Sequence, residues 1–96
     1  MTTLDYIKST LKKHKVELED RFKVKQIGVF GSYAREEEAN TSDIDILVDL
    51  YEPIGWEIID LKEFLESILG TEVDLVTLKA LKPELSDTIL KEAVYA

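Results

Sequence analysis

The sequence predicts an α/β (α+β) fold, with a small mixed β-sheet covered by helices. Two observations support this prediction. Apolar residues recur at helical spacing near the N-terminus and again in the second half of the chain. Shorter segments that concentrate or alternate apolar residues lie between them, as strands do. The resulting order is helix, strand, strand, helix, strand, helix, which is typical of one layered domain.

The helices follow from apolar residues spaced three or four positions apart. The first stripe can be interrupted near His14, and the second ends at Gly70, which suits the left-handed position after a helix. Pro83 precedes a third helical segment. The expected helices cover about residues 3–21, Ile58–Ile68 and Ser86–Val94, and Ser32–Glu37 can form a short one.

Three segments are predicted to be strands. The clearest is Ile44–Leu50, in which apolar residues alternate with acidic ones. Lys25–Phe30 predicts a strand that ends at a glycine, and Glu72–Thr77 predicts a strand with Asp74 among apolar neighbours. A polar loop is expected at Ala39–Ser42. The two faces of the clearest strand would carry Ile44, Ile46, Val48 and Leu50, and Asp43, Asp45, Leu47 and Asp49.

Length and composition restrict the class of protein. With 96 residues, 45% of them hydrophobic and 33% charged, residues 1–96 are expected to form a single domain. No apolar run reaches the roughly 20 residues that span a bilayer, and the N-terminus lacks a signal-peptide pattern, so a cytoplasmic protein without membrane contact is expected. The net charge of −8 argues against direct nucleic-acid binding and suits a basic protein partner. Without cysteine there is neither a disulfide nor a thiolate metal site.

Carboxylates recur where the strands begin. Asp43 and Asp45 are two positions apart, so their side chains point to the same side of a strand and repel each other. Two Mg²⁺ ions between such carboxylates would remove this repulsion and could clamp the oxygens of a phosphoryl transfer. Asp74 is the natural third ligand, because its apolar neighbours give that strand no other reason to hold an acid.

Gly31 and Ser32 provide a complementary feature. A strand that ends in glycine and turns into a helix points free backbone N–H groups at an anion, and glycine allows a phosphate to approach closely. The Ser32 hydroxyl can donate one more hydrogen bond. A Gly-Ser pair is usually just a turn, and an Asp-x-Asp pair is usually a solvated edge. Together they predict a site for a nucleoside triphosphate and its magnesium.

The combined motif resembles the minimal nucleotidyltransferase family, small relatives of DNA polymerase β and kanamycin nucleotidyltransferase. The resemblance rests on GSYAR at residues 31–35 and SDIDILV at residues 42–48. It extends to VDLV at residues 73–76, which is similar to the strand of the family's third carboxylate, and to ILKEAVY at residues 89–95. It therefore covers nearly the whole chain.

This resemblance implies an activity and a partner. Members are typically antitoxins of HEPN-domain ribonuclease toxins and transfer AMP from ATP to a tyrosine of the toxin, with release of pyrophosphate. By position, Gly31 and Ser32 would hold the triphosphate. Asp43 and Asp45 would bind both Mg²⁺ ions, and Asp74 would complete one ion site and assist deprotonation of the acceptor hydroxyl.

One position departs from the family pattern. Glu36 stands where relatives commonly have glycine, and a positive φ there would cost on the order of 1 kcal/mol. Glu36–Glu38 also place negative charge near the triphosphate. The neighbouring Arg35 could contact a phosphate or pair with these glutamates. Trp56 is expected to anchor the core.

Two alternatives to protein adenylylation remain open. A non-catalytic antitoxin could neutralise the toxin by contact alone, and an enzyme of this fold could transfer a nucleotide to a small molecule. Transfer to a protein is favoured because the chain has room for the sheet and its covering helices but not for a second, acceptor-binding domain. The intact set of Asp43, Asp45 and Asp74 favours catalysis over binding alone.

Overall fold

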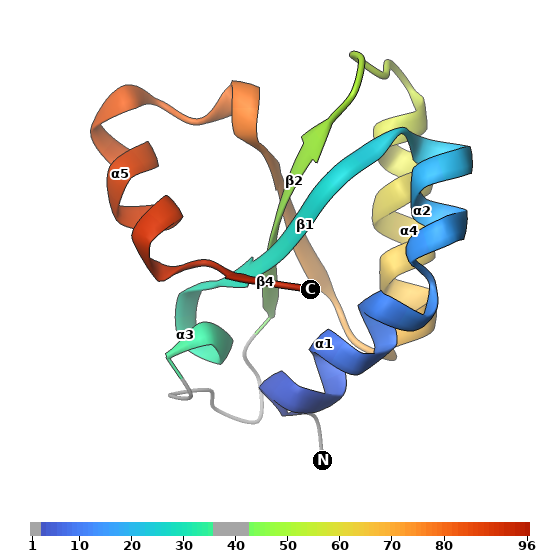
Figure 1. Ribbon diagram of the computed structural model, residues 1–96, viewed down its shortest axis with the longest axis horizontal. Helices are drawn as coiled ribbons and strands as arrows, with labels where there is room; N and C mark the ends of the chain where they lie inside the picture. Colours follow the sequence, from blue (N-terminus) through green and yellow to red (C-terminus); the bar gives the residue numbers. More distant parts are fainter. Residues whose placement is uncertain (1–2, 36–42) are drawn as a thin grey trace.

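The computed structural model describes residues 3–35 and 43–96. Figure 1 shows the helices arranged around a central twisted sheet. The elements in chain order are α1 (Leu4–Lys13), α2 (Lys15–Phe22), β1 (Val24–Phe30), α3 (Gly31–Ala34), β2 (Ile44–Leu50), α4 (Glu57–Leu69), β3 (Val73–Thr77), the 3₁₀ helix η1 (Leu78–Ala80), α5 (Pro83–Glu92) and β4 (Val94–Tyr95).

The four strands form one mixed sheet in the order β3-β2-β1-β4. β1 runs antiparallel to both β2 and β4, whereas β2 and β3 are parallel and joined through α4. This register places Asp45 opposite Phe30 on one side and opposite Asp74 on the other. The end of β1 and the beginnings of β2 and β3 therefore meet at one end of the sheet.

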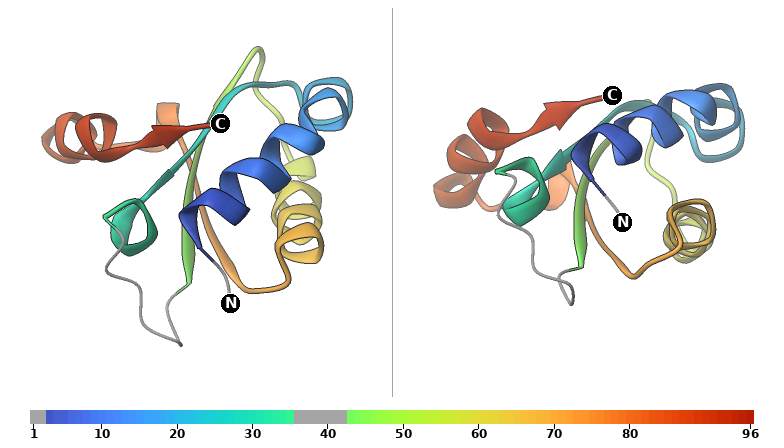
Figure 2. Two further views of the ribbon diagram at one scale, coloured as in Figure 1. Left: turned by 60° about the horizontal axis from the view of Figure 1, so that its bottom comes forward. Right: turned by 90° about the horizontal axis from the view of Figure 1, so that it is seen from below.

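The hydrophobic core fills one face of this sheet. Helices α1, α2 and α4 cover that face, while α3 and α5 lie on the opposite side, as both views of Figure 2 confirm. The alternation within β2 decides which face is which, because its even-numbered residues from 44 to 48 are fully buried in the core. The other fully buried aliphatic side chains of the core are Ile7, Leu11, Leu18, Val29, Leu61 and Leu65.

The helix ends follow local backbone chemistry. Thr3 caps α1, since its Oγ1 accepts a hydrogen bond of 3.2 Å from the Tyr6 N–H. The helical stripe breaks at His14, as the sequence indicated, and the break separates α1 from α2. Gly70 adopts φ 72° after α4, as predicted, and Lys23 adopts φ 59° after α2.

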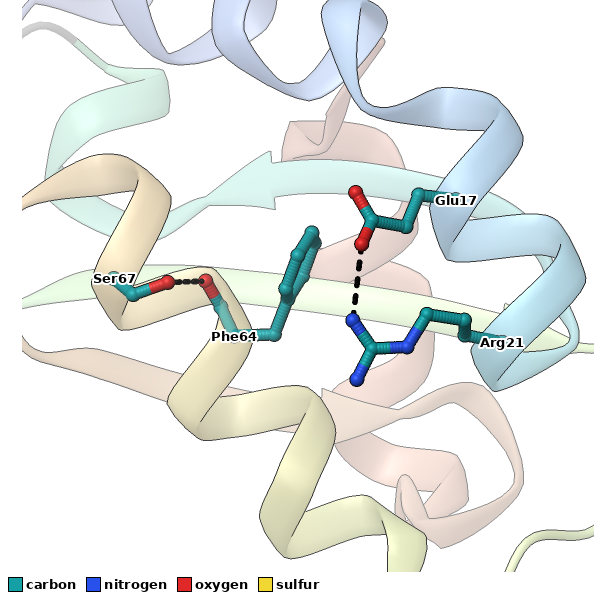
Figure 3. A network of polar contacts seen from close by, with 4 residues as sticks. All are labelled: Glu17, Arg21, Phe64 and Ser67. Carbon is teal, nitrogen blue, oxygen red and sulfur yellow. Dashed lines mark hydrogen bonds and ion pairs between the residues drawn. The ribbon is translucent and has the colours of Figure 1, made fainter.

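Helices α2 and α4 also contact each other at the edge of the core, where a guanidinium on α2 lies over an aromatic ring on α4. Arg21 and Glu17 form an ion pair of 2.9 Å on α2, and the Arg21 guanidinium carbon lies 5.4 Å from the ring centroid of Phe64 on α4 (Figure 3). Both charged side chains are about half exposed, so the pair adds little to stability. This contact lies away from the carboxylates at the end of the sheet.

Most predicted elements are confirmed, and the C-terminal segment is corrected. β2 has the predicted bounds, whereas the last helix begins at Pro83, not Ser86, because proline suits the first position of a helix. That helix ends at Glu92, so Val94 was wrongly predicted to be helical and instead pairs with Val29 in β4. The 3₁₀ helix η1 was also missed.

Some predictions cannot be compared with the structure. The short helix predicted over Ser32–Glu37 is observed as Gly31–Ala34, and its last positions lie outside the described residues, as do Glu36 and the loop Ala39–Ser42.

Trp56 is 85% exposed, so its assignment as a core anchor was wrong. Among residues 3–35 and 43–96, no helix has the length and apolarity required to cross a bilayer.

Candidate active site

The carboxylates of Asp45 and Asp74 approach each other on neighbouring strands. Asp45 lies between buried residues, and Asp74 lies between buried Val73 and partly buried Leu75, so both side chains lie on the sheet face that α1, α2 and α4 leave uncovered. Burial raises the pKa of Asp45, and the charges of Asp74 and Asp43 and a side-chain hydrogen bond with Asp74 raise it further. The nearby Arg35 opposes this rise. An unfavourable concentration of negative charge therefore lies at the start of β2 and β3.

Asp43 lies at the margin of this pair. It is exposed, directly before β2, and its charge acts on Asp45 across the two-residue spacing. Within the described parts of the chain, no three Asp, Glu, His or Cys side chains are already arranged as a complete set of metal ligands. The structure thus joins two of the three predicted acids closely and leaves the third within electrostatic reach.

Gly31 lies directly against the carboxylate of Asp45. The antiparallel pairing of Phe30 with Asp45 brings the end of β1 to this position, and Gly31 has φ 73°. A Cβ atom at Gly31 would overlap with Oδ2 of Asp45 and lie 2.9 Å from its Cγ. Glycine is required here for two reasons, the left-handed backbone and the close approach of the carboxylate.

Ser32 begins the turn that follows and is half-buried. The predicted helix is only the four-residue turn α3, so its dipole is weaker than that of a longer helix. The Gly31 carbonyl accepts a hydrogen bond from the Arg35 N–H. The N–H groups at the start of the turn, before Arg35, have no acceptor within the helix. An anion at this turn would rely on individual backbone N–H groups and the Ser32 hydroxyl.

Arg35 ends α3 and connects it to the C-terminal helix. Its Nη1 donates to Oε1 of Glu92 in α5, a residue 57 positions later. Pairing across such a separation leaves no local signal in the sequence, and the predicted alternative, pairing with Glu36–Glu38, falls on residues outside those that the structure describes. The guanidinium also acts electrostatically on Asp45, so it lies between the acidic pair and α5.

A mainly apolar hollow lies away from this acidic group. A cavity of about 140 Å³ opens at the far end of β2, lined by Val48–Leu50, Glu52–Ile54 and Thr77–Lys79. It contains Asp49, which shares a strand face with Asp45 but lies four residues further along. Asp49 therefore does not belong to the acidic group around Asp45.

Comparison with known proteins identifies the domain family. Residues 11–96 match the family model of the nucleotidyltransferase domain. The chain is 51% identical to the protein adenylyltransferase MntA of Thermococcus cleftensis over 96 residues, which cover 99% of this chain and 97% of that protein.

Solved structures share the fold. A protein described as a minimal nucleotidyltransferase has a TM-score of 0.82 and 33% identity, over 97% of this chain and 95% of its own. A toxin–antitoxin crystal structure with AMP-PNP has a TM-score of 0.75 and 28% identity, over 92% of this chain and 70% of that one.

A third structure is a tri-AMPylated HEPN toxin of Shewanella oneidensis in complex with its MNT antitoxin. It has a TM-score of 0.66 and 26% identity, over 93% of this chain and 70% of that one. The sheet topology is thus that of the minimal nucleotidyltransferase fold, and with its matching domain model the chain belongs to the nucleotidyltransferase domain family.

Proposed function

We propose that this protein is an ATP- and Mg²⁺-dependent adenylyltransferase antitoxin that transfers AMP to a tyrosine of a HEPN-domain toxin. The observation that carries the proposal is the Asp45–Asp74 pair. These two carboxylates repel each other directly beside the glycine turn at Gly31. We further propose that residues 1–96 act as one domain and that the protein acts in the cytoplasm, where ATP and Mg²⁺ are available.

The donor set suits Mg²⁺. This ion is usually held by one or two carboxylates, with water and substrate phosphates as its remaining ligands. An incomplete protein site that gathers carboxylates around Asp45 fits that preference, because the nucleotide would supply the missing oxygens. Bound there, two ions would neutralise the phosphates and the attacking oxygen.

Each residue of the site has a distinct role in the proposal. Asp43 and Asp45 hold both ions, and Asp74 completes one ion site. Asp74 also accepts the proton of the acceptor hydroxyl, whose oxygen bonds to the α-phosphorus while the bond to the β-phosphate breaks and pyrophosphate leaves. Gly31 and Ser32 hold the triphosphate through backbone N–H groups and the Ser32 hydroxyl.

The choice of a protein acceptor rests on the relatives. One relative is named as a protein adenylyltransferase, and another was captured with an AMPylated HEPN toxin. AMP-PNP in a third supports ATP as the nucleotide. The net charge of −8 would speed encounter with a basic, RNA-cleaving partner and disfavours direct binding to nucleic acid.

Labelled ATP tests this proposal. A HEPN-domain partner incubated with the protein and Mg²⁺ should retain label from α-labelled ATP and none from γ-labelled ATP, since pyrophosphate leaves. Asp43→Asn and Asp45→Asn should abolish labelling, whereas Asp49→Asn should preserve it. Labelling that survives both site substitutions would refute the proposed carboxylate chemistry.

The same experiment separates the alternatives. If no label is transferred and Asp43→Asn still silences the toxin, the protein is an antitoxin that acts by contact. If the nucleotide is consumed with a small molecule and without a protein partner, the acceptor class is wrong.

A further inference from the structure

The strand that carries Asp74 lies at an edge of the sheet. In the order β3-β2-β1-β4 of the described strands, β3 pairs with β2 on one side, and Asp74 is the second residue of β3. An edge strand has a row of backbone groups that no neighbouring strand binds. The position of Asp74 beside Asp45 therefore depends on what fixes the beginning of β3.

Glu66 of α4 fixes this beginning with its side chain. Its Oε2 accepts a hydrogen bond of 3.0 Å from the N–H of Val73, the first residue of β3, and the contact is partly buried. The chain reverses between these two residues at Gly70, whose N–H donates to the Glu66 carbonyl at 2.9 Å (Figures 1 and 2). Glu66 thus holds both the end of the helix and the start of the strand.

The same end of β3 is bound to β2 through the backbone. The Ile44 N–H donates to the Glu72 carbonyl at 3.1 Å. The parallel register then pairs Asp45 with Asp74. Val73 is 3% exposed and belongs to the core, so Asp74 points to the opposite, acidic face. A shift of Val73 would therefore move Asp74 relative to Asp45.

Glu66 does not belong to the acidic group itself. The charges that shift the pKa of Asp45 are those of Asp74, Asp43 and Arg35. Glu66 lies on α4, which covers the core face of the sheet, whereas the acidic pair lies on the other face. Its influence on the site therefore passes through the backbone of β3.

We propose that Glu66 is a positioning residue for Asp74. By accepting the Val73 N–H, it keeps Asp74 at the place where Asp74 and Asp45 can bind Mg²⁺ together. The inference rests on the proposed function, because it requires a metal ion between these carboxylates. The role needs a hydrogen-bond acceptor and not a negative charge, so a neutral side chain with an oxygen at the same reach should replace Glu66.

Two neutral substitutions of similar length separate the acceptor from the charge. Glu66→Gln keeps an acceptor oxygen, whereas Glu66→Met keeps only a weakly accepting sulfur, and both residues favour helices. The measurement is the Mg²⁺ dependence of binding of a non-hydrolysable ATP analogue, by calorimetry and without a partner protein. Glu66→Met should require about tenfold more Mg²⁺ than the wild type, because a residue that orients a metal ligand is lost. Glu66→Gln should match the wild type, as should Glu63→Met, the same change at an exposed position in the preceding turn of α4.

Hydrogen exchange of the Val73 amide measures the contact itself. This amide should exchange slowly in the wild type and in Glu66→Gln, and faster in Glu66→Met. Fast exchange in the wild type overturns the inference without any variant.

The calorimetry has two further outcomes that overturn the inference. A merely structural Glu66 predicts that Glu66→Met unfolds at a lower temperature but keeps the Mg²⁺ dependence of the wild type. A Glu66→Gln variant as impaired as Glu66→Met would show that the charge, and not the hydrogen bond, is required. A wild-type protein that binds no nucleotide with Mg²⁺ overturns the proposed function, and this inference with it.

Discussion

The backbone of Gly31 and the carboxylate of Asp45 occupy adjoining space, so that no side chain fits between them. A Cβ atom at position 31 would overlap with Oδ2 of Asp45 and lie 3.2 Å from its Cβ. The pairing of Phe30 with Asp45 fixes this approach, since it brings the end of β1 beside the start of β2. The glycine turn and the acidic pair are therefore one geometric unit.

This relationship predicts that Gly31→Ala displaces Asp45. The substitution should cost about 1–3 kcal/mol of stability from the left-handed backbone alone. The clash should reduce the rate of nucleotide transfer by about tenfold or more, because a small displacement of a catalytic group is costly. Transfer kinetics and chemical denaturation measure the two effects separately.

Gly70→Ala is the matched control for this prediction. Gly70 has φ 72°, nearly the same as Gly31, but nothing lies within 4 Å of an added Cβ. It should lose similar stability from the backbone and keep its transfer rate. Equal loss of activity in both variants would show that the backbone strain, and not the contact with Asp45, explains the effect.

The raised pKa of Asp45 predicts an unusual dependence of stability on pH. Unfolded Asp45 ionises near its usual value of 3.8, while the folded protein retains the proton to higher pH. Stability that is fully present below pH 3.8 is therefore lost as the pH rises through the folded pKa. Asp45→Asn should be more stable than the wild type at neutral pH in a chelator, and this advantage should shrink in acid.

Thermal unfolding of both proteins across pH measures this difference. Adding Mg²⁺ with a nucleotide analogue should stabilise the wild type and not Asp45→Asn, because a bound ligand favours only the state that binds it. A variant that is less stable than the wild type at neutral pH, in the absence of metal, would contradict the described repulsion around Asp45.

Substitution of Asp74, the carboxylate paired with Asp45, should weaken Mg²⁺ binding. Asp74→Asn should reduce transfer by about a hundredfold or more and raise the Mg²⁺ concentration required, since a metal ligand is lost. Asp49→Asn is its control, because Asp49 lies on the same strand face as Asp45 but at the distant cavity. The transfer rate measured at increasing Mg²⁺ concentration distinguishes the two variants. If Asp74→Asn and the wild type show the same dependence on Mg²⁺, Asp74 is not a metal ligand.

The end of α2 offers a test of the fold alone. Lys23 has φ 59°, a left-handed conformation in which a Cβ atom is unfavourable. Lys23→Gly should raise the free energy of unfolding by about 0.5–1 kcal/mol and leave transfer unchanged. Denaturant titration measures the change. A destabilised variant would show that the Lys23 side chain contributes more than its backbone costs.

The sequence predicted the parts of this molecule that depend on local pattern. The alternation in Ile44–Leu50 determined a strand and its faces, and Asp74 could be placed with the other acids because its apolar neighbours marked a second buried strand. Contacts between distant segments left no such signal. The pairing of Arg35 with Glu92 and the addition of β4 to the sheet arise from tertiary packing alone.

Gly28 illustrates the same limit. Its strand was predicted, but its lack of a side chain acquires a reason only in the fold, where an added Cβ would lie 3.0 Å from Cδ1 of Tyr95. The space above Gly28 admits this aromatic ring and lets β4 pair along β1. A two-residue strand has too little pattern to be predicted from the sequence.

The central claim is transfer of AMP through the carboxylates around Asp45. It is tested most directly by the intact mass of a HEPN-domain protein after incubation with this protein, ATP and Mg²⁺. The account predicts a mass increase of one or more AMP groups with the wild type and with Asp49→Asn, and none with Asp43→Asn. An unmodified partner that is nevertheless silenced by both the wild type and Asp43→Asn would contradict it, and would show that this protein acts by contact.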